Sequence, residues 1–297
     1  MLIRKCFRLT IIATLAWLGV TGHAPAAEIA APYVPTAPSV VDRMLEIAKV
    51  GADDFVIDLG SGDGRIVIAA ASKYGARGFG VEIDRKLIAL ANANARAAGV
   101  SDRVQFHYRD LFATDLTPAT VVTIYLLTRS VMKLQAKLFA LKPGTRIVSH
   151  AGSIGEWKPD HFEMLDVNDK VRPDAPRRTY LYLWTVPAKV SGNWRWSLPV
   201  SGRTVVYDLA LTQSFQVFSG TLRVGTQETP VSAGKLAGDR ISLQFMMEID
   251  GTQVRQQLDG RVSGGTISGT AFLAGDKIRD AVEWNATRAD SALPNGH

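Results

Sequence analysis

The sequence predicts an α/β fold, a doubly wound and mostly parallel seven-stranded sheet, followed by a C-terminal all-β antiparallel barrel or sandwich. Two observations carry this prediction. Strand-like and helix-like segments alternate from about residue 39 to residue 150, as in strands joined by crossover helices. Beyond about residue 189, strict two-residue alternation between short glycine-bounded segments takes over, which is typical of antiparallel strands.

The alternation begins with a helix. Val41, Met44 and Leu45 recur at the spacing of one helical face. Ser39 and Asp42, three residues apart, form a capping-box pattern, which places the helix start at Ser39.

The segments that follow alternate between the two patterns. They are a strand at 54–60, a helix at 65–73, a strand at 77–84, a helix at 86–98, strands at 103–110 and 119–127, a helix at 130–141 and a strand at 144–150. Two last strands, at 161–167 and 178–186, have no helix between them. We expect them to pair as an antiparallel hairpin at the sheet edge.

The chain therefore divides into three parts. Residues 1–26 form an N-terminal signal or anchor, residues 27–189 the α/β domain, and residues 190–297 a small all-β domain. Trp194 and Trp196 alternate with polar residues and are expected to pack in the core of the last part.

The net charge of +6 is spread unevenly. Residues 1–26 carry three basic residues and no acids, residues 27–189 carry a surplus of three, and the remainder is balanced. A chain this close to neutral beyond its N-terminus offers no basic surface, so we expect no nucleic-acid partner.

The N-terminus has the three parts of a secretory signal peptide. Arg4, Lys5 and Arg8 precede an apolar run from Leu9 to Val20, and small residues follow with a cleavage point after Ala26. An uncleaved anchor giving membrane association and a mitochondrial presequence are the alternative interpretations. We expect an exported, periplasmic or membrane-anchored protein, although a cofactor made in the cytoplasm would favour the cytoplasm.

The stretch "DLGSGDGR", residues 58–65, is a glycine-rich turn after a strand, the usual place of a nucleotide-like cofactor. A dinucleotide would place its pyrophosphate there, and Asp58 would repel that group. S-adenosylmethionine instead carries an ammonium group and a cationic sulfur, which Asp58 would attract. The sign of this charge favours S-adenosylmethionine.

Two more carboxylates stand at strand ends. Glu82 ends the second strand, where its two oxygens can accept hydrogen bonds from ribose hydroxyls, and Asp110 ends the third, where it can accept one from an adenine amine. Ligands of such sheets bind outside the carboxyl ends of the strands, so the three acids are expected to meet at one site.

These motifs make residues 30–187 resemble the class I, seven-β-strand S-adenosylmethionine-dependent methyltransferases with a Rossmann-like fold. The resemblance implies an enzyme that transfers a methyl group from S-adenosylmethionine. The cofactor-binding residues predicted from it are Asp58, Gly60, Ser61, Gly62, Gly64, Glu82, Ile83, Asp110 and Leu111. The sequence shows no metal-ligand spacing among its histidines.

The acceptor is indicated by two short motifs. "IYLLT" after the fourth strand lacks the Asn/Asp-Pro-Pro-aromatic motif of base-amine methylases. "YVPT", residues 33–36, resembles the segment before the domain in small protein-lysine methyltransferases related to the mitochondrial ATP synthase c-subunit lysine methyltransferase and its archaeal homologues. The resemblance implies a protein lysine substrate, with Tyr33 and Tyr125 lining the methyl-transfer channel as its catalytic residues.

Other interpretations of these residues stay open. "YVPT" also fits a polyproline-like linker, Tyr125 a strand aromatic, and His150 a structural histidine at a strand end. A methyltransferase of small molecules, or an envelope binding protein whose β domain is the working part, are the alternative functions.

Overall fold

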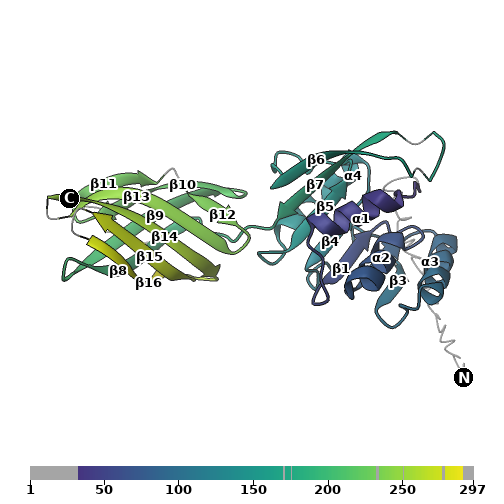
Figure 1. The fold of residues 1–297 in the computed structure, drawn as a ribbon, viewed down its shortest axis with the longest axis horizontal. Helices are drawn as coiled ribbons and strands as arrows, with labels where there is room; N and C mark the ends of the chain where they lie inside the picture. Colours follow the sequence, from purple (N-terminus) through teal and green to yellow (C-terminus); the bar gives the residue numbers. More distant parts are fainter. Residues whose placement is uncertain are drawn as a thin grey trace, which may run out of the picture.

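The computed structural model describes residues 33–169, 171–174, 176–231, 234–249, 251–275 and 278–289. The predicted signal or anchor at residues 1–26 lies outside the described residues. Within the described ranges, no helix is long and apolar enough to cross a membrane. Two separate sheets organise the chain, and Figure 1 shows them as two bodies joined by a short connection.

The first sheet has seven strands in the order β3-β2-β1-β4-β5-β7-β6. Its elements are α1 (Pro38–Ile47), β1 (Phe55–Leu59), α2 (Arg65–Tyr74), β2 (Arg77–Glu82), α3 (Arg85–Ala97), β3 (Val104–Tyr108), β4 (Val121–Ile124), α4 (Thr128–Phe139), β5 (Arg146–His150), β6 (His161–Asp166) and β7 (Arg178–Thr185). Strands β1 to β5 pair in parallel, whereas β7 runs antiparallel to both β5 and β6. The predicted α/β class is confirmed, with a mixed sheet.

Helices cover both faces of this sheet. Val56 and Val148 pack against α1 and α2, while the neighbouring residues Ile57 and Ile147 pack against α4. Adjacent residues of a strand point to opposite faces, so strands buried on both faces read as continuous apolar runs. This explains why "FVID" and "RIVS" predict strands without polar alternation.

The predicted capping box of the first helix is wrong. α1 begins at Pro38, and Ser39 does not cap it with its side chain. The Ser39 backbone N–H instead donates to Asp169 Oδ2 at 2.8 Å, from the loop between β6 and β7, while Asp42 pairs with a lysine of α2. Proline at the first position of the helix already has the helical φ, and the carboxylate of Asp169 accepts the hydrogen bond of the free N–H at Ser39.

The second sheet has nine antiparallel strands in the order β11-β10-β9-β8-β16-β15-β14-β13-β12. They are β8 (Gly192–Val200), β9 (Arg203–Ser214), β10 (Val217–Val224), β11 (Gln227–Val231), β12 (Lys235–Ala237), β13 (Arg240–Ile249), β14 (Thr252–Ser263), β15 (Thr266–Gly275) and β16 (Ile278–Ala289). β11 and β10 contact β13 and β12 across the body, so one curled sheet closes on itself instead of two stacked sheets. Its core contains Trp194 and Trp196, as expected.

The two bodies touch at the amino ends of the parallel strands. Phe215, at the tip of the β9–β10 hairpin, stacks on Trp157 with ring centroids 5.9 Å apart and meets the edge of Phe139. Gln216 Nε2 donates to Lys158 O at 2.7 Å. The carboxyl ends of the parallel strands lie at the opposite end of the first sheet from these contacts.

Candidate active site

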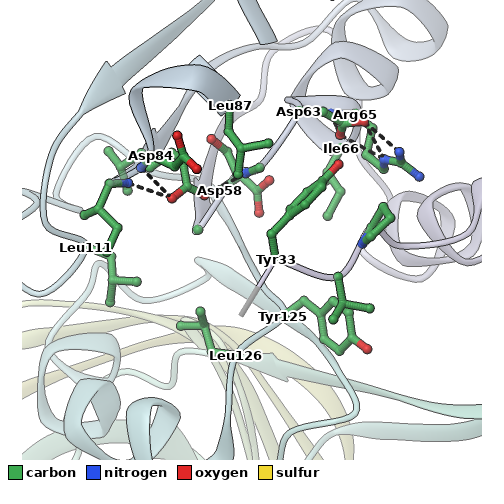
Figure 2. A pocket seen from close by; sticks show the side chains of 18 of the residues that line it. Tyr33, Asp58, Asp63, Arg65, Ile66, Asp84, Leu87, Leu111, Tyr125 and Leu126 are labelled. Carbon is green, nitrogen blue, oxygen red and sulfur yellow. Dashed lines mark hydrogen bonds and ion pairs between the residues drawn. The ribbon is translucent and has the colours of Figure 1, made fainter. Parts of the chain in front are cut away.

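A cavity of about 680 Å³ lies at the carboxyl ends of β1, β2, β3 and β4 (Figure 2). Its volume falls within the range of small-molecule sites, roughly 300–1,000 Å³. The predicted residues that line it are Tyr33, Asp58, Gly60, Ser61, Gly62, Glu82, Ile83, Asp110, Leu111 and Tyr125. All of its described lining residues fall between 33 and 127, so the described part of the second sheet adds none.

The turn between β1 and α2 requires glycine. Gly60, Gly62 and Gly64 have φ of +81°, +54° and +82°, in the left-handed region. A Cβ at Gly62 would lie 2.5 Å from Tyr33 Cε2, and one at Gly64 would lie 2.5 Å from Phe106 Cζ. Gly64 is the N-cap of α2 and lies outside the cavity lining, whereas the other two face the cavity.

Ser61 anchors the glycine turn to β2. Its backbone N–H donates to Val81 O at 2.9 Å, which fixes the turn against β2. Its Oγ is buried and has no hydrogen-bond partner among the described residues. The hydroxyl packs against Gly80 of β2, where an added Cβ would lie 2.5 Å from Oγ.

Asp58 is a buried carboxylate at the end of β1, only 2 % exposed. Its Oδ1 accepts a hydrogen bond of 2.7 Å from Thr123 Oγ1 on β4. Burial, together with the nearby charges of Glu82 and Asp63, raises the pKa of Asp58 to about 7, against the lowering effect of Thr123. A cation placed beside it would restore the charged form, because an opposite charge favours ionisation.

Glu82 is held by backbone N–H groups at the end of β2. Its Oε1 accepts from the N–H of Ile83 at 2.7 Å and of Asp84 at 3.1 Å, and its Oε2 accepts from the N–H of Gly62 at 3.1 Å. This last contact ties the glycine turn to β2. A carboxylate has about four acceptor positions, so Glu82 keeps capacity for a hydroxyl donor in the cavity.

The third carboxylate, Asp110, stands just beyond β3. Its Oδ1 accepts from the N–H of Phe112 at 2.8 Å, which leaves Oδ2 available. Ile83 and Leu111 line the cavity beside it and give this end an apolar lining suited to a flat ring. Figure 2 shows Asp84 and Leu111 on the opposite side of the cavity from Tyr33 and Tyr125, with Asp58 between them.

Tyr33 forms the wall over the glycine turn. Its ring lies against Gly62, and its hydroxyl lies near the charged groups of Asp63 and Arg65. Burial is the largest cause that raises the pKa of this phenol. Burial alone would also raise the pKa of Asp63, but the hydrogen bonds and charge of Arg65 outweigh it and hold that pKa below its ordinary value.

Tyr125 forms a second aromatic wall just beyond the end of β4. Its ring is half-buried and stacks on the His150 ring, with centroids 3.8 Å apart and planes at 29°. Burial raises the pKa of the Tyr125 phenol, so it stays protonated at neutral pH. His150 itself lies behind Tyr125 and is not part of the cavity lining.

Several residues that line the cavity were not predicted from the sequence. Four of them form two pairs. Asp63 and Arg65 form an ion pair of 2.6 Å beside Tyr33, and the Arg85 guanidinium lies 4.0 Å from the centre of the Tyr108 ring. Tyr108 ends β3 and Arg85 begins α3, so both positions could have been found from the rule that strand and helix ends surround the site. The contact of Arg65 with the Tyr33 segment has no local sequence signal.

These groups fit S-adenosylmethionine. Asp58 would supply the negative charge for an ammonium group, and Glu82 the acceptors for ribose hydroxyls. A pyrophosphate would instead face Asp58, Glu82 and Asp63 together, which disfavours a dinucleotide.

Comparison with known proteins agrees with this assignment. The family described as the ANTKMT methyltransferase domain matches residues 58–161, which span the cavity-forming turn and strand ends. The protein-lysine N-methyltransferase of Saccharolobus islandicus is 49% identical over 154 residues, which cover 51% of this chain and 92% of the relative.

More distant relatives and a solved structure carry related names. The adenine nucleotide translocase lysine N-methyltransferase of Mus musculus is 35% identical over 43% of this chain and 56% of its own length. The lysine N-methyltransferase of the ATP synthase c-subunit from Xenopus laevis is 32% identical over 44% and 58%. A crystal structure titled as an RNA methyltransferase from Salinibacter ruber with S-adenosyl-L-homocysteine is 48% identical over 53% of this chain and 96% of that one, with a TM-score of 0.47.

Proposed function

Because the chain belongs to the protein-lysine N-methyltransferase family of the Saccharolobus islandicus enzyme, we propose that it transfers a methyl group from S-adenosylmethionine to the side-chain amine of a protein lysine. One observation carries this proposal beyond family membership. Three carboxylates at successive strand ends, Asp58, Glu82 and Asp110, face one cavity that two tyrosines also line.

The chemistry is a displacement at a methyl carbon. The neutral lysine nitrogen forms the new N–C bond, the bond between sulfur and methyl breaks with its electron pair passing to sulfur, and the methylated amine then releases a proton to solvent. A lysine with a pKa of about 10.4 is charged at pH 7, so presenting it neutral costs about 4–5 kcal/mol.

The protein's part is alignment and exclusion of water. Tyr33 and Tyr125 present aromatic surface at the cavity, where an enclosed lysine stem is less well solvated and the charged amine is disfavoured. Fixing the two reacting atoms in line can lower the barrier by roughly 7–11 kcal/mol, so the reaction needs no dedicated general base.

The test is transfer of label from S-adenosylmethionine, labelled at the methyl group, to cell fractions incubated with the full chain. We expect label in protein that is recovered as methyl-lysine after acid hydrolysis. The matched control is Glu82→Gln, which keeps the shape of the side chain but removes its charge, and should lose most of the transfer. Label found only in small molecules or only in RNA would refute the lysine assignment.

We further propose that residues 1–26 act as an export signal or membrane anchor. The basic start followed by the apolar run from Leu9 to Val20 supports this proposal. A C-terminal alkaline phosphatase fusion reports the compartment. Phosphatase activity that disappears when Arg4, Lys5 and the apolar run are removed supports export. An inactive phosphatase fusion, together with an active C-terminal fusion to a reporter that works only in the cytoplasm, contradicts it.

A further inference from the structure

His150 is packed behind Tyr125 instead of in the cavity. Its ring is 6 % exposed and stacks on Tyr125 at 3.8 Å between centroids. Tyr125 therefore has cavity on one side and a histidine ring on the other. Any shift of the Tyr125 ring away from the cavity is opposed by that histidine, because packed interiors resist displacement.

Both nitrogens of the His150 ring are held. Nε2 lies 2.7 Å from Thr179 Oγ1 on β7, and Nδ1 lies 3.4 Å from Thr36 Oγ1 in the segment before α1. Both threonine hydroxyls belong to buried residues. Burial lowers the pKa of His150 to about 4, so at neutral pH the ring is uncharged and fits this apolar setting.

The contact with Thr36 continues to the other tyrosine. The Thr36 carbonyl accepts a 2.6 Å hydrogen bond from Arg65 Nη1, Arg65 pairs with Asp63, and this ion pair lies beside the Tyr33 hydroxyl. Figure 2 shows the Asp63–Arg65 pair next to Tyr33, with Tyr125 on the same side of the cavity. An unbroken series of contacts thus joins the two aromatic walls.

We propose that His150 is a positioning residue that fixes Tyr125 against the cavity and, through Thr36, sets its spacing from Tyr33. The proposal rests on the proposed function. The space between the two rings limits how closely the amine can align and how many methyl groups it can carry, because each added methyl widens the amine head. His150 acts through Tyr125 and touches no reacting atom.

The test compares four full-length proteins: wild type, His150→Ala, His150→Phe and the control His161→Ala, an exposed histidine at the start of β6. For each we would measure the S-adenosylmethionine Kd by calorimetry, kcat for protein methylation, and the proportions of mono-, di- and trimethyl-lysine at equal turnover. Thermal melting identifies a variant that fails to fold.

Removing the ring should lower kcat of His150→Ala by at least ~10-fold and change the proportions of methyl-lysine products, with the Kd within about 3-fold of wild type. His150→Phe restores a ring behind Tyr125 but not the bond to Thr36, so it should recover most of the rate and only part of the product pattern, while His161→Ala behaves as wild type. If His150→Ala does not fold, His150→Phe is compared with His150→Gln, whose side chain cannot stack on Tyr125. The proposal then predicts a higher kcat for His150→Phe than for His150→Gln.

The proposal is overturned if His150→Ala has the same kcat and the same methyl-lysine products as the wild type. It is also overturned if His150→Phe folds but is as impaired as His150→Ala. A loss that appears equally in Kd would also overturn it, because the effect would then lie in the cofactor site. The wild-type measurement separates the two claims: a wild type that produces no methyl-lysine contradicts the proposed function itself.

Discussion

The Thr123 hydroxyl donates a 2.7 Å hydrogen bond to the Asp58 carboxylate between the ends of two neighbouring parallel strands. This contact stabilises a charge that burial disfavours, and it does so incompletely, since the pKa of Asp58 remains raised to about 7. In the protein alone, Asp58 is therefore only partly ionised near neutral pH. A cationic ligand beside Asp58 would complete the compensation, and cofactor binding would then depend on the protonation of this one residue.

The first prediction concerns Asp58→Asn. The amide can still accept the hydrogen bond from Thr123 but carries no buried charge, so the free energy of unfolding at pH 8 should rise, by about 1 kcal/mol or more. Binding of S-adenosylmethionine should fall at least ~100-fold, because the ammonium loses its counter-charge. Thermal melting and calorimetry of the same samples measure the two effects. A variant that is less stable and still binds would contradict this role of Asp58.

The second prediction is a pH dependence of cofactor affinity. The folded pKa of Asp58 is raised, so the group takes up a proton as the pH falls through about 7. A cation favours the charged form, and binding therefore releases that proton. Affinity should rise with pH by up to about tenfold per unit below pH 7 and level off above it, which titrations between pH 5.5 and 7.5 would show. Flat affinity across that window, or affinity that rises toward acid, is the contrary result.

Asp58 also affects the stability of the ligand-free protein. Here the effect of pH is opposite: affinity rises with pH, whereas the contribution of Asp58 to stability falls. Because the raised pKa favours the neutral carboxyl in the folded state, the contribution of Asp58 to the free energy of unfolding is fully present below its unfolded pKa of about 3.9. That contribution is lost as the pH rises toward about 7 and then stays constant. Asp58→Asn should remove this part of the pH dependence, which melting curves at several pH values can detect.

The third prediction compares Gly62→Ala with Gly99→Ala. Both positions have positive φ, so alanine should cost roughly 1–2 kcal/mol of stability at each. A Cβ at Gly99 meets nothing within 4 Å, whereas one at Gly62 would collide with the Tyr33 ring. Gly62→Ala alone should therefore displace Tyr33 and lower the methylation rate by at least ~10-fold. Equal rates in the two variants would show that the Tyr33–Gly62 contact does not matter.

The fourth prediction concerns the junction of the two bodies. Phe215→Ala removes the ring that stacks on Trp157 and meets the edge of Phe139, and it should cost roughly 2–3 kcal/mol, less than a fully buried phenylalanine. The two bodies should then unfold in separate transitions by calorimetry, while cofactor affinity stays unchanged because the junction lies at the far pole. Phe272→Ala, a 47 % exposed phenylalanine of β15, is the control. One shared transition in Phe215→Ala would contradict the role of this contact.

Much of the site could be predicted because parallel strands impose their own geometry. Once Asp58, Glu82 and Asp110 each follow a strand of the same parallel set, their carboxylates must meet at one edge of the sheet. The negative charge of Asp58, together with the order of the strands, also predicts the class of cofactor, because it favours a cationic ligand over a pyrophosphate. Methyltransferase family membership, predicted from these motifs, is confirmed by the relative from Saccharolobus islandicus.

The remainder depends on contacts between segments far apart in the sequence. The cap of α1 comes from Asp169, and the wall over the glycine turn comes from Tyr33, whose segment reaches the turn through Arg65. No local pattern records which loop passes over which turn, since loop paths are set by tertiary packing. For the same reason the alternation in the last hundred residues predicts strands but does not distinguish a curled sheet from a sandwich.

The central claim is that the acidic strand-end cavity is the S-adenosylmethionine site of a lysine methyltransferase. Its most direct test is isothermal titration of S-adenosylmethionine into the full chain and into Glu82→Gln, at pH 7.5. We expect binding with one site per chain for the wild type, and affinity reduced at least ~10-fold in Glu82→Gln, which loses the charged acceptors for the ribose hydroxyls. No binding to the folded wild-type chain, or undiminished binding to Glu82→Gln, would contradict the claim.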